Sequence, residues 1–261
     1  MRKSVFLALL LFFSVGTFAQ KKKKNDKAEP AKQETVVQQP QQQQPVVKEE
    51  PKKDTVPQIN PLVQHFYYKY QLATQWGDSE VAKSALYDLI IQNPSNDSLV
   101  FQLAYYYFQS QKYLSSALIS QELLKRNPKN TSVLEVAAIS YENLGANDRA
   151  LQSYESLYLL QNSPMSLYKM ATLQLQLKRY KESSTSVDIL MASKEAETLK
   201  VTYTGADNKA KEYPLKVALL NIKGVLSQEQ GDKISAKKFF DMALAQAPDF
   251  VPAKDNLSKL K

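Results

Sequence analysis

The sequence predicts an all-α, right-handed solenoid of about five helical hairpins, closed by a C-terminal helix. Three observations support this prediction. Small residues and leucines recur along the chain at nearly constant spacing, the expected turns coincide with glycine or polar residues, and prolines follow the second helices of several hairpins. Stacked repeats of this kind form extended surfaces, so we expect a surface suited to binding a partner.

Four columns of residues carry the repeat. The turn positions are Gly77, Gln111, Gly145, Lys178 and Gly231, separated by steps of 34, 34, 33 and 53 residues. A small residue follows five positions later, as Ala82, Ser116, Ala150, Ser183 and Ala236. The same steps relate Tyr70, Ala104, Ala138, Ala171 and Gly224, and also Leu89, Leu123, Leu157, Leu190 and Ala243. One chance motif would not place four columns in step.

The columns have a steric reason. Two helices approach closely only where a side chain is small, and leucines fill the layer between hairpins. In the central copy, residues 141–157, a helix ends near Gly145, and Asn147 or Asp148 is expected to cap the next helix.

Start and stop signals set the element boundaries. Asn60 as cap and Pro61 as first helical residue open the first hairpin, which turns at Gly77 and continues over 79–93. The second hairpin is expected over 97–126, the third over 131–161, the fourth from Ser163 to about 192 or 195, and the fifth over 215–247. Pro94, Pro128 and Pro248 end second helices, and Pro252 begins a capping helix that reaches Leu260.

The step of 53 residues exceeds a normal repeat and locates an insert at about 194–213. Leu199 to Thr204 alternates β-branched and polar residues, and Gly205, Ala206, Asp207 and Asn208 form a turn signal. We interpret the insert as a β-hairpin or a long loop. Because an isolated hairpin is marginally stable in water, it must lean on the solenoid or on a partner. The insert is either a specificity element or a plain elaboration of a connection.

This pattern resembles the tetratricopeptide repeat family, over roughly residues 60–261. The last copy matches best, with Gly224, Gly231, Asp232, Ala236, Phe240, Ala243 and Pro248. The first copy has Tyr70 where the family has a small residue, and the fourth lacks both Gly and Pro. The resemblance implies a concave groove lined by the first helix of each hairpin.

The groove positions implied by the resemblance are Tyr67, Gln71, Phe101, Tyr105, Phe108, Ile139, Tyr168, Leu175, Asn221 and Val225. They are mostly aromatic and uncharged, and Tyr67 and Gln71 stand where carboxylate-clamping relatives carry Lys and Asn. The run Tyr105 to Phe108 is either core, with Tyr107 inside, or a functional patch. Four successive residues cover every face of a helix, so at least one should reach the surface.

The sequence offers little for catalysis or for a cofactor. His65 is the only histidine and there is no cysteine, which excludes a Cys–His pair and an ordinary zinc site. Acidic residues are scattered, and no phosphate-binding or nucleophile-elbow motif is present. We therefore expect a non-catalytic protein without metal or cofactor.

The N-terminal segment predicts export. Arg2 and Lys3 precede the apolar run Val5 to Phe13, and small residues lead to a cleavage site after Ala19, so residues 1–19 are expected to be a signal peptide. Residues 20–58, rich in Lys, Gln and Pro, are expected to be a disordered linker. Lys21, Lys22, Lys23 and Lys24 either touch an anionic membrane or wall surface or are simply solvated.

The formal charge of +8 does not predict nucleic-acid binding. The linker holds nine lysines against six acids, and the repeat body holds 23 basic against 20 acidic residues without a basic stripe. Residues 59–261 are therefore expected to be a protein–protein interaction scaffold of the bacterial cell envelope, periplasmic or envelope associated, which binds a peptide or helix in its groove. The alternative is a cell-wall carbohydrate-binding module or an accessory factor of an envelope enzyme, because aromatic faces also stack on sugars.

Overall fold

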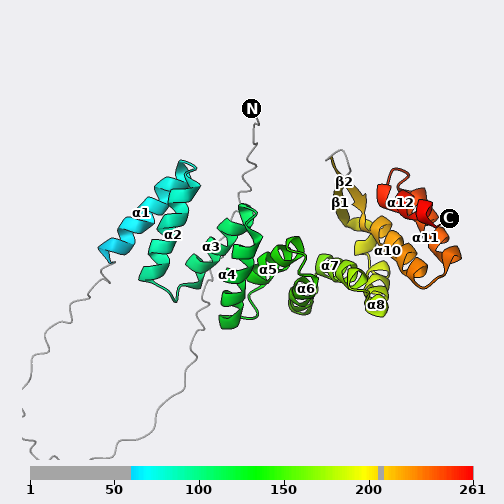
Figure 1. Ribbon diagram of the computed structural model, residues 1–261, viewed down its shortest axis with the longest axis horizontal. Coiled ribbons are helices and arrows are strands. Elements are labelled where there is room, and N and C mark those ends of the chain that lie inside the picture. Colours follow the sequence, from blue (N-terminus) through cyan, green and yellow to red (C-terminus); the bar gives the residue numbers. More distant parts are fainter. Residues whose placement is uncertain (1–59, 205–208, 261) are drawn as a thin grey trace, which may run out of the picture. The chain divides into compact units, whose positions relative to one another are not determined.

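The computed structural model describes residues 60–204 and 209–260, and this part of the chain forms five consecutive helical hairpins and a final helix (Figure 1). The hairpins are α1 Pro61–Gln75 with α2 Ser79–Gln92, α3 Asp97–Gln109 with α4 Tyr113–Arg126, α5 Thr131–Asn143 with α6 Asn147–Gln161, α7 Pro164–Gln176 with α8 Tyr180–Met191, and α10 Leu215–Glu229 with α11 Lys233–Gln246. Helix α12, Val251–Lys259, follows the fifth hairpin. The predicted signal peptide, the linker with Lys21, Lys22, Lys23 and Lys24, and the turn Gly205 to Asn208 lie outside the described residues.

The helices begin where the capping signals predict, with one exception. Asn60 accepts a hydrogen bond from the Leu62 amide at 2.9 Å, and Ser163 accepts one from the Ser166 amide at 3.3 Å, so both satisfy amides that lack an intrahelical partner. The predicted cap at Asn147 or Asp148 is wrong. Ala146 is the N-cap of α6 and has no side chain that could accept a hydrogen bond, because the hairpin turn is completed one residue earlier.

All five predicted turn positions have positive φ. The glycines have φ of 72° at Gly77, 69° at Gly145 and 83° at Gly231. Gln111 and Lys178 adopt the same left-handed region, with φ of 57° and 60°, although they carry a Cβ. The repeat therefore imposes its turn geometry even where the sequence lacks glycine.

The small-residue columns mark the close contacts between helices. Ser116, Ala150, Ser183 and Ala236 are fully buried, and so are Ala104, Ala138 and Ala171 in the other small column. Four of the five members of the leucine column are leucines, and all five members, Leu89, Leu123, Leu157, Leu190 and Ala243, are buried. Except at Tyr70, these columns are buried in every hairpin, as the repeat pattern predicts.

The insert contains a β-hairpin, as one of the two interpretations predicted. Strand β1, Lys200–Thr204, pairs antiparallel with β2, Ala210–Pro214, and a short helix α9, Glu195–Thr198, precedes it. The hairpin leans on the helices: Val201 and Tyr213 are buried, and the rings of Tyr203 and Tyr213 each pack edge-on against Phe250 with centroids 4.9 Å apart. Phe250 precedes α12, so the hairpin and the final helix share one aromatic cluster.

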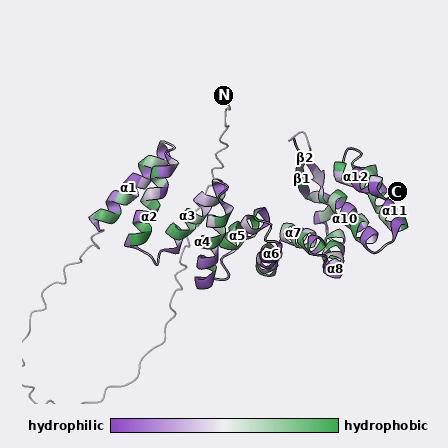
Figure 2. Cartoon of the chain, in the orientation of Figure 1, coloured by the Kyte–Doolittle hydropathy of each residue, from purple (hydrophilic) through white to green (hydrophobic). Residues whose placement is uncertain are grey.

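Hydrophilic and hydrophobic residues are mixed along the helices, as Figure 2 shows. Within the described ranges, no helix combines the length and the apolar character needed to cross a bilayer.

Candidate functional site

Three sets of positions on the first helices of the hairpins make up the candidate surface. The predicted groove residues, extended by the repeat steps, form sets that we call the inner columns: Tyr67, Phe101, Glu135, Tyr168 and Asn221; Gln71, Tyr105, Ile139, Thr172 and Val225; and Thr74, Phe108, Glu142, Leu175 and Gln228. Side chains at such positions lie on one face of a helix, because they are three or four residues apart. The inner columns therefore give each first helix one equivalent face.

Helix α3 carries an aromatic row on this face, formed by Phe101, Tyr105 and Phe108. The ring centroids of Phe101 and Tyr105 are 6.2 Å apart, those of Tyr105 and Phe108 are 6.0 Å apart, and both pairs are stacked. Tyr105 is 44% exposed. The expectation that one residue of the run reaches the surface is confirmed.

Tyr106 and Tyr107 contact the neighbouring hairpin, and the Tyr106 hydroxyl donates to Glu80 Oε1 on α2 at 3.1 Å. Tyr107, expected inside, is partly buried, and its hydroxyl lies 2.8 Å from that of Tyr87 on α2. In the first hairpin, Tyr67 and Gln71 are exposed.

The inner columns of α5, α7 and α10 meet in a cavity of about 590 Å³, which we call the inner cavity. Its walls include Glu142, Tyr168, Thr172, Leu175 and Asn221, and strand β1 forms its remaining side. The structure thus brings three predicted groove residues together: Tyr168, Leu175 and Asn221. Ile139 and Val225 are partly buried and do not line it.

The insert covers Tyr168. This residue is only 7% exposed, and its hydroxyl lies 2.8 Å from that of Tyr203 on β1. Burial, reinforced by the neighbouring Tyr203, raises the pKa of the Tyr168 phenol well above its ordinary value. Tyr168 therefore serves as a neutral part of the cavity wall, and the exposed members of the inner columns are better placed to contact a large ligand.

Sequence reasoning missed a polar cluster on the same face. Lys169 Nζ donates to both carboxylate oxygens of Glu142, at 2.7 and 3.1 Å, and the Tyr154 hydroxyl donates to Glu142 Oε2 at 3.0 Å. The repeat steps contain the signal that would have found it, because Glu142 occupies the same inner column as Phe108 and Leu175. The cluster places the carboxylate of Glu142, already hydrogen-bonded to Lys169 and Tyr154, on a largely uncharged surface.

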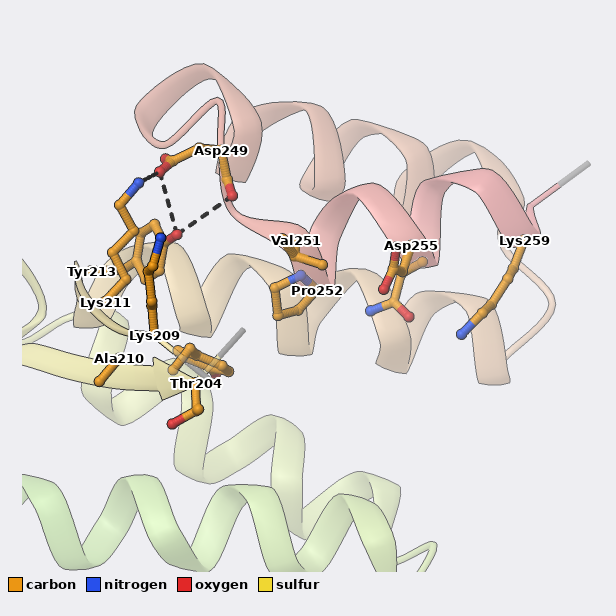
Figure 3. A pocket seen from close by; sticks show the side chains of 12 residues that line it. Thr204, Lys209, Ala210, Lys211, Tyr213, Asp249, Val251, Pro252, Asp255 and Lys259 are labelled. Carbon is orange, nitrogen blue, oxygen red and sulfur yellow. Dashed lines mark hydrogen bonds and ion pairs between the residues drawn. The ribbon is translucent and has the colours of Figure 1, made fainter. Parts of the chain in front are cut away.

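A second cavity, of about 820 Å³, lies between β2 and α12 (Figure 3), and we call it the end cavity. Lys211 pairs with Asp249, and the Tyr213 hydroxyl donates to the carboxylate and the backbone carbonyl of Asp249 at 3.4 Å. A further step of 34 residues from Asn221 and Val225 reaches Asp255 and Lys259, which also line this cavity.

The β-hairpin separates the two cavities. In β1, Lys200, Val201 and Thr202 line the inner cavity, Thr204 lines the end cavity and Tyr203 lines both, whereas β2 lines the end cavity only. In the end cavity, the Lys211–Asp249 pair fastens β2 to the turn before α12. We therefore treat the aromatic row and the inner cavity as the candidate site, and the end cavity as the place where the insert is anchored.

His65 lies on α1 beside a separate apolar cavity of about 390 Å³ that Tyr68, Leu72 and Trp76 also line. Among residues 60–204 and 209–260, no three His, Cys, Asp or Glu side chains gather as a metal site would require.

These features define a helical-hairpin repeat protein whose inner columns form its candidate site. The fold is that of tetratricopeptide repeat proteins. A tetratricopeptide repeat protein from Parabacteroides merdae superposes with a TM-score of 0.56 at 18% identity, over 77% of this chain and 73% of that one.

Two further solved structures share the fold. YrrB, described as a TPR protein with an unusual peptide-binding site, gives a TM-score of 0.58 at 12% identity over 73% of this chain and 89% of its own. MamA gives 0.55 at 10% identity over 74% and 96%. No protein-family model and no curated protein sequence matches the chain.

Proposed function

We propose that this chain is a protein–protein interaction scaffold that holds a segment of a partner protein against its inner columns. The observation that carries the proposal is the aromatic row on α3, which is accessible at Tyr105 and shares its inner columns with the residues that line the inner cavity. Interface energy concentrates on a few large aromatic anchors, and a stack of hairpins presents them in a fixed geometry. The peptide-binding site ascribed to YrrB, which has the same fold, supports this function.

The stacking within the aromatic row favours a protein ligand over a polysaccharide. Phe101 and Phe108 both stack with Tyr105, at interplanar angles of 30° and 26°, so the three rings form one apolar row along α3. Such a row suits the apolar side chains of a peptide, whereas it offers no hydrogen-bond partners to most of the hydroxyl groups of a polysaccharide. The scaffold reading is therefore preferred to a carbohydrate-binding module.

Capture of a partner from envelope extract tests the function. The full chain is compared with a variant that carries Phe101→Ala and Tyr105→Ala, and with a control that carries Leu159→Ala and Ile234→Ala. The control residues are highly exposed apolar side chains on α6 and α11, the second helices of their hairpins. We expect the first variant to weaken binding by at least ~2 kcal/mol, about 30-fold in Kd, with helicity unchanged, and the control to bind normally.

Equal binding by both variants would contradict the proposal. Saturable binding of purified wall polysaccharide that is lost with the first variant only would assign the surface to carbohydrate instead.

We further propose that the scaffold works in the bacterial cell envelope. The support is in the sequence alone: a charged start, an apolar run and small residues before position 20, with no cysteine anywhere. Under this proposal, residues 20–58 tether the repeats, and Lys21, Lys22, Lys23 and Lys24 contact anionic surface.

A further inference from the structure

We propose that the free edge of β1 is a strand-addition site, which takes an extended segment of the partner with alternating apolar and acidic residues. The inference rests on the proposed function, because it specifies the form of ligand that the inner cavity accepts. It concerns backbone groups of the insert and is independent of the aromatic row.

The ladder between β1 and β2 shows which backbone groups are free. The Leu215 amide donates to the Leu199 carbonyl at 2.8 Å, and the register pairs Val201 with Tyr213 and Thr202 with Glu212. Hydrogen-bonded and non-hydrogen-bonded pairs alternate in an antiparallel ladder. Val201 therefore bonds to β2, whereas the amides and carbonyls of Lys200 and Thr202 point away from it.

Both residues border an open cavity. Lys200 and Thr202 are exposed and line the inner cavity, whose floor includes Met165, Thr172 and Leu175 of α7. No other segment in the described ranges hydrogen-bonds to the outward backbone groups of these two residues. An edge of unpaired amides and carbonyls is a template for one more strand.

The other edge of the hairpin is less suited to the same role. Pro214 stands at an outward position of β2 and has no N–H to donate. Lys211 and Tyr213 are fastened to Asp249 at the turn before α12. The geometry therefore singles out β1.

The alternation of side chains along β1 and the local charge define the sequence of the segment that binds there. A strand added to β1 continues its alternation, so residues level with Val201 and Tyr203 face Met165 and Leu175 and should be apolar. Residues level with Lys200 and Thr202 lie on the other face, beside the Lys200 side chain, which is 64% exposed and whose Nζ lies 3.6 Å from Glu212 Oε2 in a solvent-exposed ion pair that leaves room for a second carboxylate. Opposite charges stabilise cross-strand neighbours, so acidic residues are favoured there.

Defined peptides and two matched variants test the site. The probe is the peptide acetyl-Val-Glu-Val-Thr-Val-Glu-amide, titrated into the full chain, with Lys replacing Glu in a second peptide. Thr202→Pro removes one outward N–H from β1, and Glu212→Pro removes the paired outward N–H from β2, so both leave the ladder intact. We expect Thr202→Pro to weaken binding of the acidic peptide about tenfold or more and Glu212→Pro to change it less than about twofold.

The lysine peptide should bind several-fold more weakly than the acidic one. N-methylation of the peptide amides that face β1 should abolish binding, because strand addition depends on main-chain hydrogen bonds. Hydrogen exchange of the unmodified protein gives a second readout: the Lys200 and Thr202 amides should become protected when the acidic peptide binds.

Equal binding to the wild-type chain and to Thr202→Pro would overturn the proposal, as would no saturable binding up to about 1 mM, a weak affinity by any standard. Protection of both amides from hydrogen exchange before any peptide is added would also overturn it. That result would mean that the N-terminal segment of this chain, or a second copy of the chain, already pairs with β1. The two proposals can fail separately. If the partner no longer binds the Phe101→Ala and Tyr105→Ala variant but still binds Thr202→Pro normally, the scaffold function is supported and the strand-addition site is refuted.

Discussion

Replacing Gly224 with alanine is expected to destabilise the protein, although alanine ordinarily favours a helix. A Cβ at Gly224 would lie 2.3, 2.5 and 2.8 Å from Cε1, Cδ1 and Cζ of Phe240, a fully buried ring on α11. Ordinary carbon contacts are about 3.5 Å, so the ring must move by more than about 1 Å in a close-packed core. Overpacking of this severity lowers the free energy of unfolding by about 3 kcal/mol, and the higher helix propensity of alanine raises it by about 1 kcal/mol. The net loss of stability is therefore about 2 kcal/mol.

Thermal and urea unfolding of the full chain, followed by circular dichroism, measure this loss. For a domain of this size, 2 kcal/mol corresponds to a fall in Tm of roughly 4–8 °C. Phe240→Leu, alone and combined with Gly224→Ala, completes a double-mutant cycle. We expect the combination to cost less than the sum of the single changes, because the smaller side chain makes room for the methyl group. A Gly224→Ala protein as stable as the wild type would refute the close approach of α10 and α11.

Two further predictions concern the buried tyrosines and the N-terminus. Burial raises the pKa of Tyr154, Tyr168 and Tyr203 in the folded protein. Their phenols in the unfolded chain therefore ionise first, at the ordinary pKa of about 10. The free energy of unfolding that the neutral phenols contribute is complete below that pH and is lost as the pH rises above it. Tyr168→Phe should flatten that loss in urea unfolding at pH 8, 10 and 11, and an unchanged profile would show that Tyr168 ionises freely. Mass analysis of the native protein should find Gln20 at its N-terminus, and Met1 retained on cytoplasmic protein would reject export.

Local signals explain how much of the fold could be predicted. Helix ends followed from caps and prolines that act on neighbouring residues, so Asn60, Ser163 and Pro164 start helices where expected. The turn at Lys178 followed from the repeat step alone, since neither glycine nor proline marks it. The cap of α6 was missed because Asn147 is a good capping residue that lies one position too late.

The candidate site could be predicted only in part. The repeat steps placed Phe101, Tyr105 and Phe108 on one face, and the structure brings Tyr168, Leu175 and Asn221 into one cavity. The covering of Tyr168 by Tyr203 could not be predicted, because it joins residues 35 positions apart across an insert that breaks the repeat. The free edge of β1 likewise depends on where the hairpin docks, and Phe250 and Asp249, beyond the fifth hairpin, fix that position.

Hydrogen exchange of the full chain, with and without the captured partner, tests the central claim most directly. If the inner columns hold the partner, protection should rise in α3 around Tyr105 and along β1, while α4 and α6 exchange as before. Protection confined to the second helices of the hairpins, or to residues before position 60, would show that the partner binds elsewhere and would contradict the account.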